Sequence, residues 1–258
     1  MILSKPNHIK IYGHRGARGD LPENTLESFR YLFANDINAY ETDILITKDL
    51  TPVITHDFRL DPSFTKDEDG NWINDENIKI FDLTYDEISK FDVGTLNKLT
   101  RYGRRFVNQK SLENQKIPKL SELLDLSSKN ISENLLINLE IKSTPDEENL
   151  TPSTEDTVKL VINEINKSNL KNKIIISSFD WRILAEIKNQ NLKIPRAYLT
   201  FQQEAGSKIK NTIYNRSPWM NFLPLAENFE LPKIIKEQGG KAWHPYHKDI
   251  TKKLVDIS

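Results

Sequence analysis

Short apolar runs alternate along this chain with segments whose apolar residues recur at helical spacing, and this alternation constrains the fold most. The pattern is typical of βαβ units, in which a helix carries the chain back between parallel strands. Seven runs are predicted to be strands: Lys10–Gly13, Ala39–Ile46, Pro52–His56, Leu135–Ile141, Lys173–Ser177, Arg196–Thr200 and Lys241–Trp243. With 258 residues, the chain is predicted to be an α/β protein of the (β/α)8 TIM-barrel type, formed as a single domain over residues 1–258.

The predicted helices have recognisable starts and apolar stripes. Thr25–Ala34 is predicted to be a helix with Asn24 as its N-cap, and Glu27, three residues later, completes a capping-box pattern. Apolar residues on one face predict two more helices, Asp156–Lys167 and Asp180–Asn189. We interpret these stripes as surfaces that pack against the barrel.

Residues 59–118 interrupt the alternation after the third predicted strand. They contain a turn at Asp67–Gly70, one short helix and the basic, aromatic stretch Arg101–Phe106. A segment that leaves from the end of the third strand would start at the mouth of the barrel. We therefore predict a lid-like insertion that folds over this mouth.

Composition excludes several classes of function. The 36 basic and 37 acidic side chains give a formal charge of -1, so no overall field favours nucleic acid or an anionic membrane. Cysteine is absent, so metal ligands would be carboxylates or histidines. The sequence shows neither a signal-peptide pattern nor an apolar run of the roughly 20 residues that span a bilayer. We predict a cytoplasmic protein with no nucleic-acid partner and no transmembrane segment, and leave its oligomeric state open.

Carboxylates gather on one face of two predicted strands. Glu41 and Asp43 are two residues apart, so they point to the same side of their strand. In the fourth strand, Glu140 and Lys142 share one face, while the opposite face is apolar. Because helices cover the outside of a barrel, the charged face is predicted to point inward, near the C-terminal mouth where active sites of this fold lie.

Three carboxylates in a partly buried cavity repel one another, and a divalent cation would relieve that repulsion. Oxygen ligands suit Mg²⁺ or Ca²⁺ best, with Mn²⁺ as a third choice. The alternative is a salt-bridge network in which Lys142 neutralises the carboxylates without a metal.

Two histidines would reach the same mouth, because His14 follows the first predicted strand and His56 ends the third. Histidine titrates near neutrality and suits proton transfer during displacement at phosphorus. Each alone could equally be a core histidine, but together, with carboxylates between them, they favour a catalytic interpretation. Arg15 adds a planar cation suited to phosphate oxygens, and Lys142 could add a point charge.

An ordered set of short motifs carries a family resemblance. The motifs are His14-Arg-Gly16, Pro22-Glu-Asn-Thr25, Glu41-Thr-Asp43, Thr47-Lys-Asp49, His56-Asp57 and Glu140-Ile-Lys142. In this order the chain resembles the glycerophosphodiester phosphodiesterases, and the resemblance runs from about Lys10 to near the C-terminus.

The resemblance implies a metal-dependent phosphodiesterase that converts a small-molecule glycerophosphodiester into glycerol 3-phosphate and an alcohol. It implies metal ligands at Glu41, Asp43 and Glu140, a general acid–base pair at His14 and His56, and phosphate contacts from Arg15 and Lys142. Phe179 and Trp243 are weaker candidates for the substrate cleft, with ordinary packing as an equal alternative. The resemblance leaves open which histidine is the acid, and whether water or the glycerol hydroxyl is the nucleophile.

Two other functions stay open: a barrel that binds a phosphorylated ligand without cleaving it, and a phospholipase D-type activity on lysophospholipids, for which an apolar rim would be expected. Arg101, Arg104 and Arg105 of the insertion either select the head group or merely solvate the lid. The eighth strand typical of the family is missing after the seventh. We therefore expect a fragment of a slightly longer protein, or a gap covered by another segment or partner.

Overall fold

The computed structural model of the chain describes residues 10–190, 192–203, 211–252 and 254. The strands are β1 (Gly13–His14), β2 (Ala39–Ile46), β3 (Pro52–Ile54), β4 (Leu136–Ile141), β5 (Ile174–Ser178), β6 (Arg196–Thr200) and β7 (Ala242–Pro245). The α-helices are α1 (Leu26–Ala34), α2 (Tyr85–Ile88), α3 (Leu120–Lys129), α4 (Thr154–Lys167), α5 (Trp181–Asn189) and α6 (Leu231–Glu237). Short 3₁₀ helices are η1 (Ile80–Asp82), η2 (Lys171–Lys173), η3 (Pro218–Met220) and η4 (His247–Asp249). No helix in these described ranges is both long and apolar enough to cross a bilayer.

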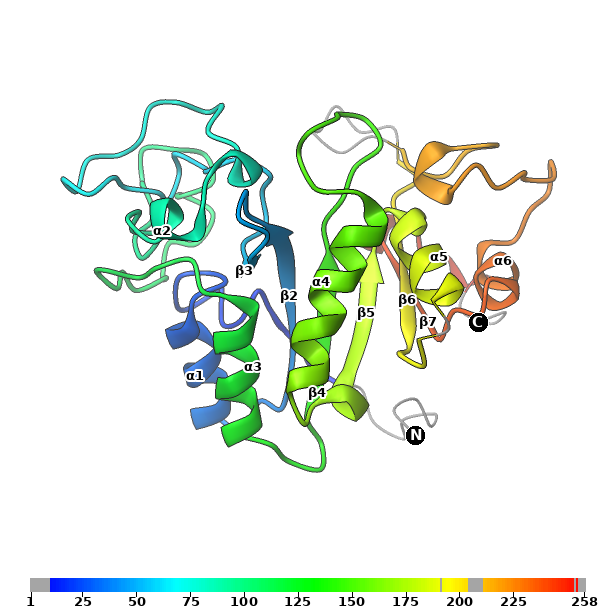
Figure 1. The fold of residues 1–258 in the computed structure, drawn as a ribbon, viewed down its shortest axis with the longest axis horizontal. Helices are drawn as coiled ribbons and strands as arrows, with labels where there is room; N and C mark the ends of the chain where they lie inside the picture. The colour runs from blue at the N-terminus through cyan, green and yellow to red at the C-terminus, as the bar shows by residue number, and fades with distance from the viewer. Residues whose placement is uncertain (1–9, 191, 204–210, 253, 255–258) are drawn as a thin grey trace.

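Six strands form one parallel sheet in the order β1-β2-β4-β5-β6-β7. Helices α1, α3, α4 and α5 follow one another along one face of this sheet (Figure 1). This is the strand-and-helix arrangement of a (β/α)8 barrel, as predicted, with β1 and β7 at the two ends of the strand order in the described part of the chain.

The prediction for the third strand was wrong in direction. We expected Pro52–His56 to be a parallel barrel strand, but β3 pairs antiparallel with the end of β2, with Leu45 opposite Val53. The reason is the short connection: only residues 47–51 separate the two strands, whereas a parallel crossover needs about a dozen residues or more. The hairpin turns where Leu50 adopts a positive φ of 61°. As a result, β3 runs back towards the middle of β2, and the backbone N–H of Thr55 donates to the carbonyl of Asp43 at 3.1 Å.

The main apolar core lies between the sheet and its helices, as the stripes predicted. The stripe residues of α4 and α5 are buried in it: Val158, Val161, Ile162, Ile165, Ile183, Leu184 and Ile187. Each fully buried aliphatic side chain of this kind contributes about 1.5–3 kcal/mol to folding. The core therefore packs against the outer face of the sheet. The charged side chains of β2 and β4 lie on its inner face.

The insertion has a smaller apolar cluster of its own, seated on β2 and β3. Its members are Leu45, Val53, Leu60, Ile73, Ile80, Ile88, Val93 and Ile117. The chain returns beside the point where it left, because the N–H of Ile54 donates to the carbonyl of Pro118 at 2.8 Å, and Val53 bridges Lys119. The insertion thus extends beyond the end of β2, around α2 (Figure 1).

Candidate active site at the mouth of the barrel

The three carboxylates predicted to gather do lie together. The parallel register pairs Asp43 of β2 with Glu140 of β4, and Glu41 lies two residues earlier on the same face of β2. One carboxylate oxygen from each lies within 4.8 Å of the others. Among the residues that the structure describes, this is the one group of three or more acidic or histidine side chains close enough to hold a metal ion.

The excess of negative charge in this cluster favours a bound cation. Burial, and the neighbouring carboxylates of Asp43 and Glu140, raise the pKa of Glu41 well above its ordinary value. The Oε1 atom of Glu41 is buried and has no hydrogen-bond partner in the described part of the chain. Such an orphaned oxygen is costly unless something electropositive meets it, so the three side chains fit a divalent cation.

Lys142 provides part of the salt-bridge network that was the alternative to a metal. Its Nζ lies 2.9 Å from Glu140 Oε1 and 3.8 Å from Asp43 Oδ1. Although burial would lower the pKa of Lys142, these two carboxylates raise it, so the side chain stays charged. Lys142 neutralises one side of the cluster but leaves Glu41 Oε1 without a partner, so the alternative accounts for only part of the site.

Arg15 is held by carboxylates on both its backbone and its side chain. Its N–H donates to Glu41 Oε2 at 3.0 Å, its Nη1 donates to Glu23 Oε1 at 2.8 Å, and its Nε lies 3.3 Å from Asp43 Oδ2. Burial alone would lower the pKa of Arg15, but Asp43 and Glu23 raise it. The backbone bends sharply here, with positive φ at Arg15 and Gly16, and a Cβ on Gly16 would lie 2.4 Å from Ser28 Oγ.

Asn24 supports the cluster instead of capping the helix, which corrects the sequence prediction. The N-cap of α1 is Thr25, whose hydroxyl accepts from the N–H of Ser28 at 3.3 Å. Asn24 is therefore free to donate from Nδ2 to Asp43 Oδ2 at 3.1 Å, and its Oδ1 accepts from the Thr42 hydroxyl at 2.9 Å. Burial raises the pKa of Asp43, but His56, Arg15, Lys142 and this hydrogen bond together hold it well below its usual range.

His14 lies at the end of β1, in register with Glu41. Its Nε2 is 3.4 Å from Glu41 Oε2, and its Nδ1 is 2.8 Å from an Nη atom of Arg18. Partial burial of the ring, followed by the guanidinium groups of Arg18 and Arg15, lowers the pKa of His14 to about 4.

His56 reaches the cluster because β3 runs back beside β2, not because it ends a parallel barrel strand. Its Nδ1 lies 2.8 Å from Asp57 Oδ1. Burial raises the pKa of Asp57, but its hydrogen bond to His56 and the nearby charges of His56, Arg15 and Lys142 together outweigh this, and the net shift is downward. An ionised Asp57 accepts the hydrogen from Nδ1 and leaves Nε2 of His56 as the acceptor nitrogen.

Several contacts with the site were missed by the sequence reasoning. Glu23 accepts a hydrogen bond from Arg15, and Asp57 accepts one from His56. Glu23 and Asp57 lie inside motifs that the sequence singled out, but these contacts were not predicted. Tyr102 of the insertion donates its hydroxyl hydrogen to Glu23, and Arg18 contacts His14. No local pattern links Tyr102 to Glu23, since only the folded insertion brings them together.

A cavity of about 1090 Å³ adjoins the His56–Asp57 side of the site. It is lined by Asp57, Phe58, Arg59, Leu60, Asp61, Pro62, Ser63, Glu76, Thr100, Arg101, Tyr102 and Arg105. Of the three insertion arginines, Arg101 and Arg105 line this cavity, whereas Arg104 donates to the carbonyl of Leu99 at 2.7 Å.

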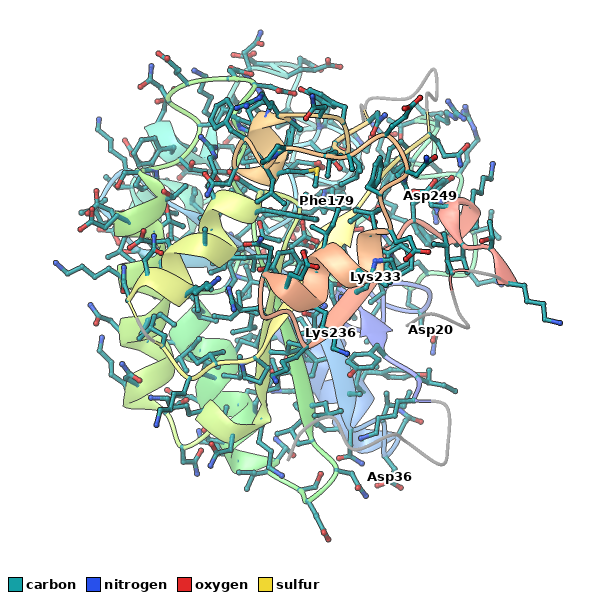
Figure 2. All side chains as sticks on the ribbon, turned by 90° about the vertical axis from the view of Figure 1, so that its right-hand side faces the viewer. Asp20, Asp36, Phe179, Lys233, Lys236 and Asp249 are labelled. Carbon is teal, nitrogen blue, oxygen red and sulfur yellow. The ribbon has the colours of Figure 1, made fainter. Side chains whose placement is uncertain are left out.

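The two aromatic candidates for the cleft differ in surroundings. Trp243 packs against the main core, and its indole N–H donates to the Thr200 hydroxyl at 2.9 Å, which supports the packing alternative. Phe179 is half-buried after β5 and lies towards the same end of the molecule as Asp249, whereas Asp36, beyond α1, lies towards the opposite end (Figure 2). A substrate contact for Phe179 stays a prediction.

Comparison with known proteins agrees with this geometry. A model of the glycerophosphoryl diester phosphodiesterase family matches residues 14–249. A glycerophosphodiester phosphodiesterase of Caldanaerobacter subterraneus is 30% identical over 190 residues, which cover 73% of this chain and 66% of that relative.

Among solved structures, one from Silicibacter pomeroyi, provisionally named a glycerophosphoryl diester phosphodiesterase, has a TM-score of 0.85 and 34% identity, over 99% of this chain and 81% of its own. An Oleispira antarctica phosphodiesterase, in complex with the product sn-glycerol-3-phosphate, shares the fold with a TM-score of 0.66 at 21% identity, over 96% of this chain and 79% of its own. Since the family model covers most of the sequence, the chain belongs to the glycerophosphoryl diester phosphodiesterase family.

Proposed function

We propose that this chain hydrolyses glycerophosphodiesters to glycerol 3-phosphate and an alcohol, in a reaction that depends on a divalent cation. One observation carries the proposal: in a member of this family, three buried carboxylates converge between two histidines and leave Glu41 Oε1 unpaired. A barrel mouth that holds acidic, basic and titratable groups together is the usual place for catalysis in this fold.

Glu41, Asp43 and Glu140 would hold the cation. Three carboxylates with oxygen ligands favour Mg²⁺ or Ca²⁺, and Mn²⁺ is a third candidate. When bound, such an ion withdraws charge from phosphate oxygens and offsets the negative charge of the carboxylates.

Arg15 and Lys142 would contact the phosphate. Both are largely buried and charged, and both are held against Asp43, so their positive groups are fixed beside the carboxylates. Fixed cations in a partly dry site stabilise the charge that builds on the phosphate oxygens during displacement. The planar guanidinium also orients the phosphate for in-line attack.

The hydrogen bonds around the histidines suggest their roles. His56 donates from Nδ1 to Asp57, so its Nε2 can take the proton of the attacking hydroxyl as the general base. The nucleophile's oxygen forms a bond to phosphorus while the bond to the leaving alcohol's oxygen breaks. His14 donates a hydrogen bond from Nε2 to the leaving oxygen, and the proton taken up by His56 passes to that oxygen through solvent, so both rings end the step neutral. Water as the nucleophile gives glycerol 3-phosphate directly, whereas attack by the substrate's glycerol hydroxyl gives a cyclic phosphate that water then opens.

Phospholipase D-type activity on a lysophospholipid is the alternative, and the family match does not favour it. Leu99 and Val107 of the insertion are 86% and 72% exposed, close in sequence to Arg101 and Arg105, which line the cavity beside His56. Singly exposed apolar side chains are common on protein surfaces, so these two do not make the apolar rim that a lysophospholipid would need.

The test measures hydrolysis of glycerophosphocholine and of a lysophosphatidylcholine in parallel, with Mg²⁺, Ca²⁺, Mn²⁺ or a chelator. We expect turnover of the glycerol diester with one of these ions and none with the chelator. Faster turnover of the lysolipid would replace the proposed substrate with this alternative. Binding of glycerol 3-phosphate without turnover of either substrate would favour the non-catalytic barrel. Fractionation of the source cells tests the predicted cytoplasmic location.

A further inference from the structure

Arg18 forms a hydrogen bond with one ring nitrogen of His14. Its Nη2 lies 2.8 Å from Nδ1 of His14. A guanidinium group can only donate hydrogen bonds, so this Nδ1 must accept and carries no hydrogen. The hydrogen of the neutral ring is then on Nε2, the nitrogen that lies 3.4 Å from Glu41 Oε2 and faces the carboxylate cluster.

The insertion holds Arg18 in this position. The guanidinium carbon of Arg18 lies 5.0 Å from the ring centre of Phe106, at cation–π distance. The buried side chain of Gln109 donates to the Arg18 carbonyl at 2.8 Å, and the N–H of Lys110 donates to the carbonyl of Asp20 at 2.8 Å. Side-chain and backbone contacts from residues 106–110 thus fix the loop that carries Arg18.

We propose that Arg18 is a positioning residue for His14, and that the insertion keeps it in place through Phe106. Arg18 fixes the orientation of the ring and the nitrogen that bears its hydrogen, so that His14 presents an N–H towards the substrate oxygens. His56 has the opposite arrangement, because Asp57 takes the hydrogen of its Nδ1. The two histidines therefore face the site as one donor and one acceptor. This role rests on the proposed phosphodiesterase function and deepens it.

A direct contact with the substrate phosphate is the main competing role for Arg18. The two roles predict different losses, because a residue that only binds phosphate changes KM, whereas one that orients a catalytic side chain changes kcat. The position of the hydrogen on His14 provides a second readout that does not depend on turnover.

The experiment compares Arg18→Met, Arg18→Lys and Phe106→Leu in the full chain. Arg30→Met is the matched control, because Arg30 is an exposed arginine of α1 that pairs with Glu27. Steady-state kinetics with glycerophosphocholine give kcat and KM. Nitrogen-15 NMR of histidine-labelled protein in Mg²⁺ reports which ring nitrogen is protonated, and the chain has only five histidines, so a His14→Gln sample identifies the His14 signals.

In the parent protein we expect the His14 signals of a ring with its hydrogen on Nε2. Arg18→Met should mix the two tautomers and lower kcat roughly tenfold, a moderate loss for a misplaced catalytic group, with KM nearly unchanged. Arg18→Lys should recover part of kcat, since lysine still donates, and Phe106→Leu should lose part of it. The control should change neither readout.

Two results would overturn the proposal. A raised KM with unchanged kcat in Arg18→Met would make Arg18 a phosphate contact. Unchanged His14 signals in Arg18→Met would show that Arg18 does not fix the ring. If the parent protein hydrolyses no phosphodiester, the proposed function fails, but the NMR comparison still decides whether Arg18 controls the tautomer of His14.

Discussion

Replacing Glu41 by Gln should change stability in opposite directions with and without a cation. In the metal-free protein, burial together with Asp43 and Glu140 raises the pKa of Glu41 above its ordinary value of 4.5. Above that pH the unfolded state releases the proton more readily than the folded state, so folding stability falls as pH rises. The amide cannot ionise, and its oxygen can still accept from the N–H of Arg15. The metal-free variant should therefore be at least as stable as the parent at pH 8.

The size of the gain follows from the spacing of the charges. Two carboxylate charges 4.8 Å apart repel by about 3.5 kcal/mol at an effective dielectric constant of roughly 20. Arg15 and Lys142 offset much of this, because both contact the same cluster. We expect a net gain of about 1 kcal/mol, or roughly 2–4 °C in the melting temperature of a domain of this size. The gain should shrink as the pH is lowered through 4.5, because below that pH the carboxyl group of Glu41 is protonated in both states.

With the cation present the order should reverse. A ligand at a hundred times its Kd stabilises the folded state by about 2.7 kcal/mol, or roughly 5–10 °C. The parent should gain this increment in Mg²⁺, Ca²⁺ or Mn²⁺, and the Gln variant should lose most of it. Scanning calorimetry with chelator and with a cation series measures both states. Glu186→Gln, a change on α5 outside the cluster, is the matched control. An equal cation shift in the parent and the Glu41 variant would refute the assignment of this residue as a ligand.

Three further predictions concern activity. His14→Ala and His56→Ala should each lower kcat roughly 100-fold, the scale of general acid–base groups, with an unchanged melting temperature; near-normal turnover would remove that histidine from the mechanism. Chelation should abolish hydrolysis and added cation should restore it, whereas a parent protein indifferent to chelator would contradict a metal-dependent site. Replacing Arg101, Arg104 and Arg105 together by Gln should alter the relative kcat/KM for choline, ethanolamine and glycerol diesters, because two of the three line the cavity; an unchanged ranking would mean that the insertion does not select the head group.

The gathering of the carboxylates could be predicted from the sequence because it depends on strand periodicity alone. Residues two apart on one strand share a face, so Glu41 and Asp43 needed no tertiary information. The inward direction of Glu140 followed from the apolar opposite face of its strand. The same periodicity is indifferent to strand direction, so it could not show that β3 runs antiparallel. The five-residue connection before Pro52 carried that information.

Contacts across the insertion could not be predicted, because they join residues distant in sequence without any repeating pattern. Tyr102 meets Glu23, and Phe106 meets Arg18, only after the insertion has packed on β2 and β3. Asn24 was misassigned for a related reason. Asn24 and Thr25 are neighbours, and both are suited to capping a helix. Asn24 donates a hydrogen bond to Asp43 in the site, and Thr25 caps α1, a choice that local propensity does not decide.

The chain leaves and re-enters the barrel at neighbouring points, where the N–H of Ile54 donates to the carbonyl of Pro118 and Val53 forms a β-bridge with Lys119. A segment that leaves and returns at neighbouring points can change in length or content without altering the spacing of the strands that carry it. The residues that such a change would alter are those that surround the cavity and reach Glu23 and Arg18. The barrel thus keeps the three carboxylates in place while the insertion can be exchanged as a unit, and a graft of this segment between relatives would transfer the surroundings of the cavity without rebuilding the proposed metal ligands.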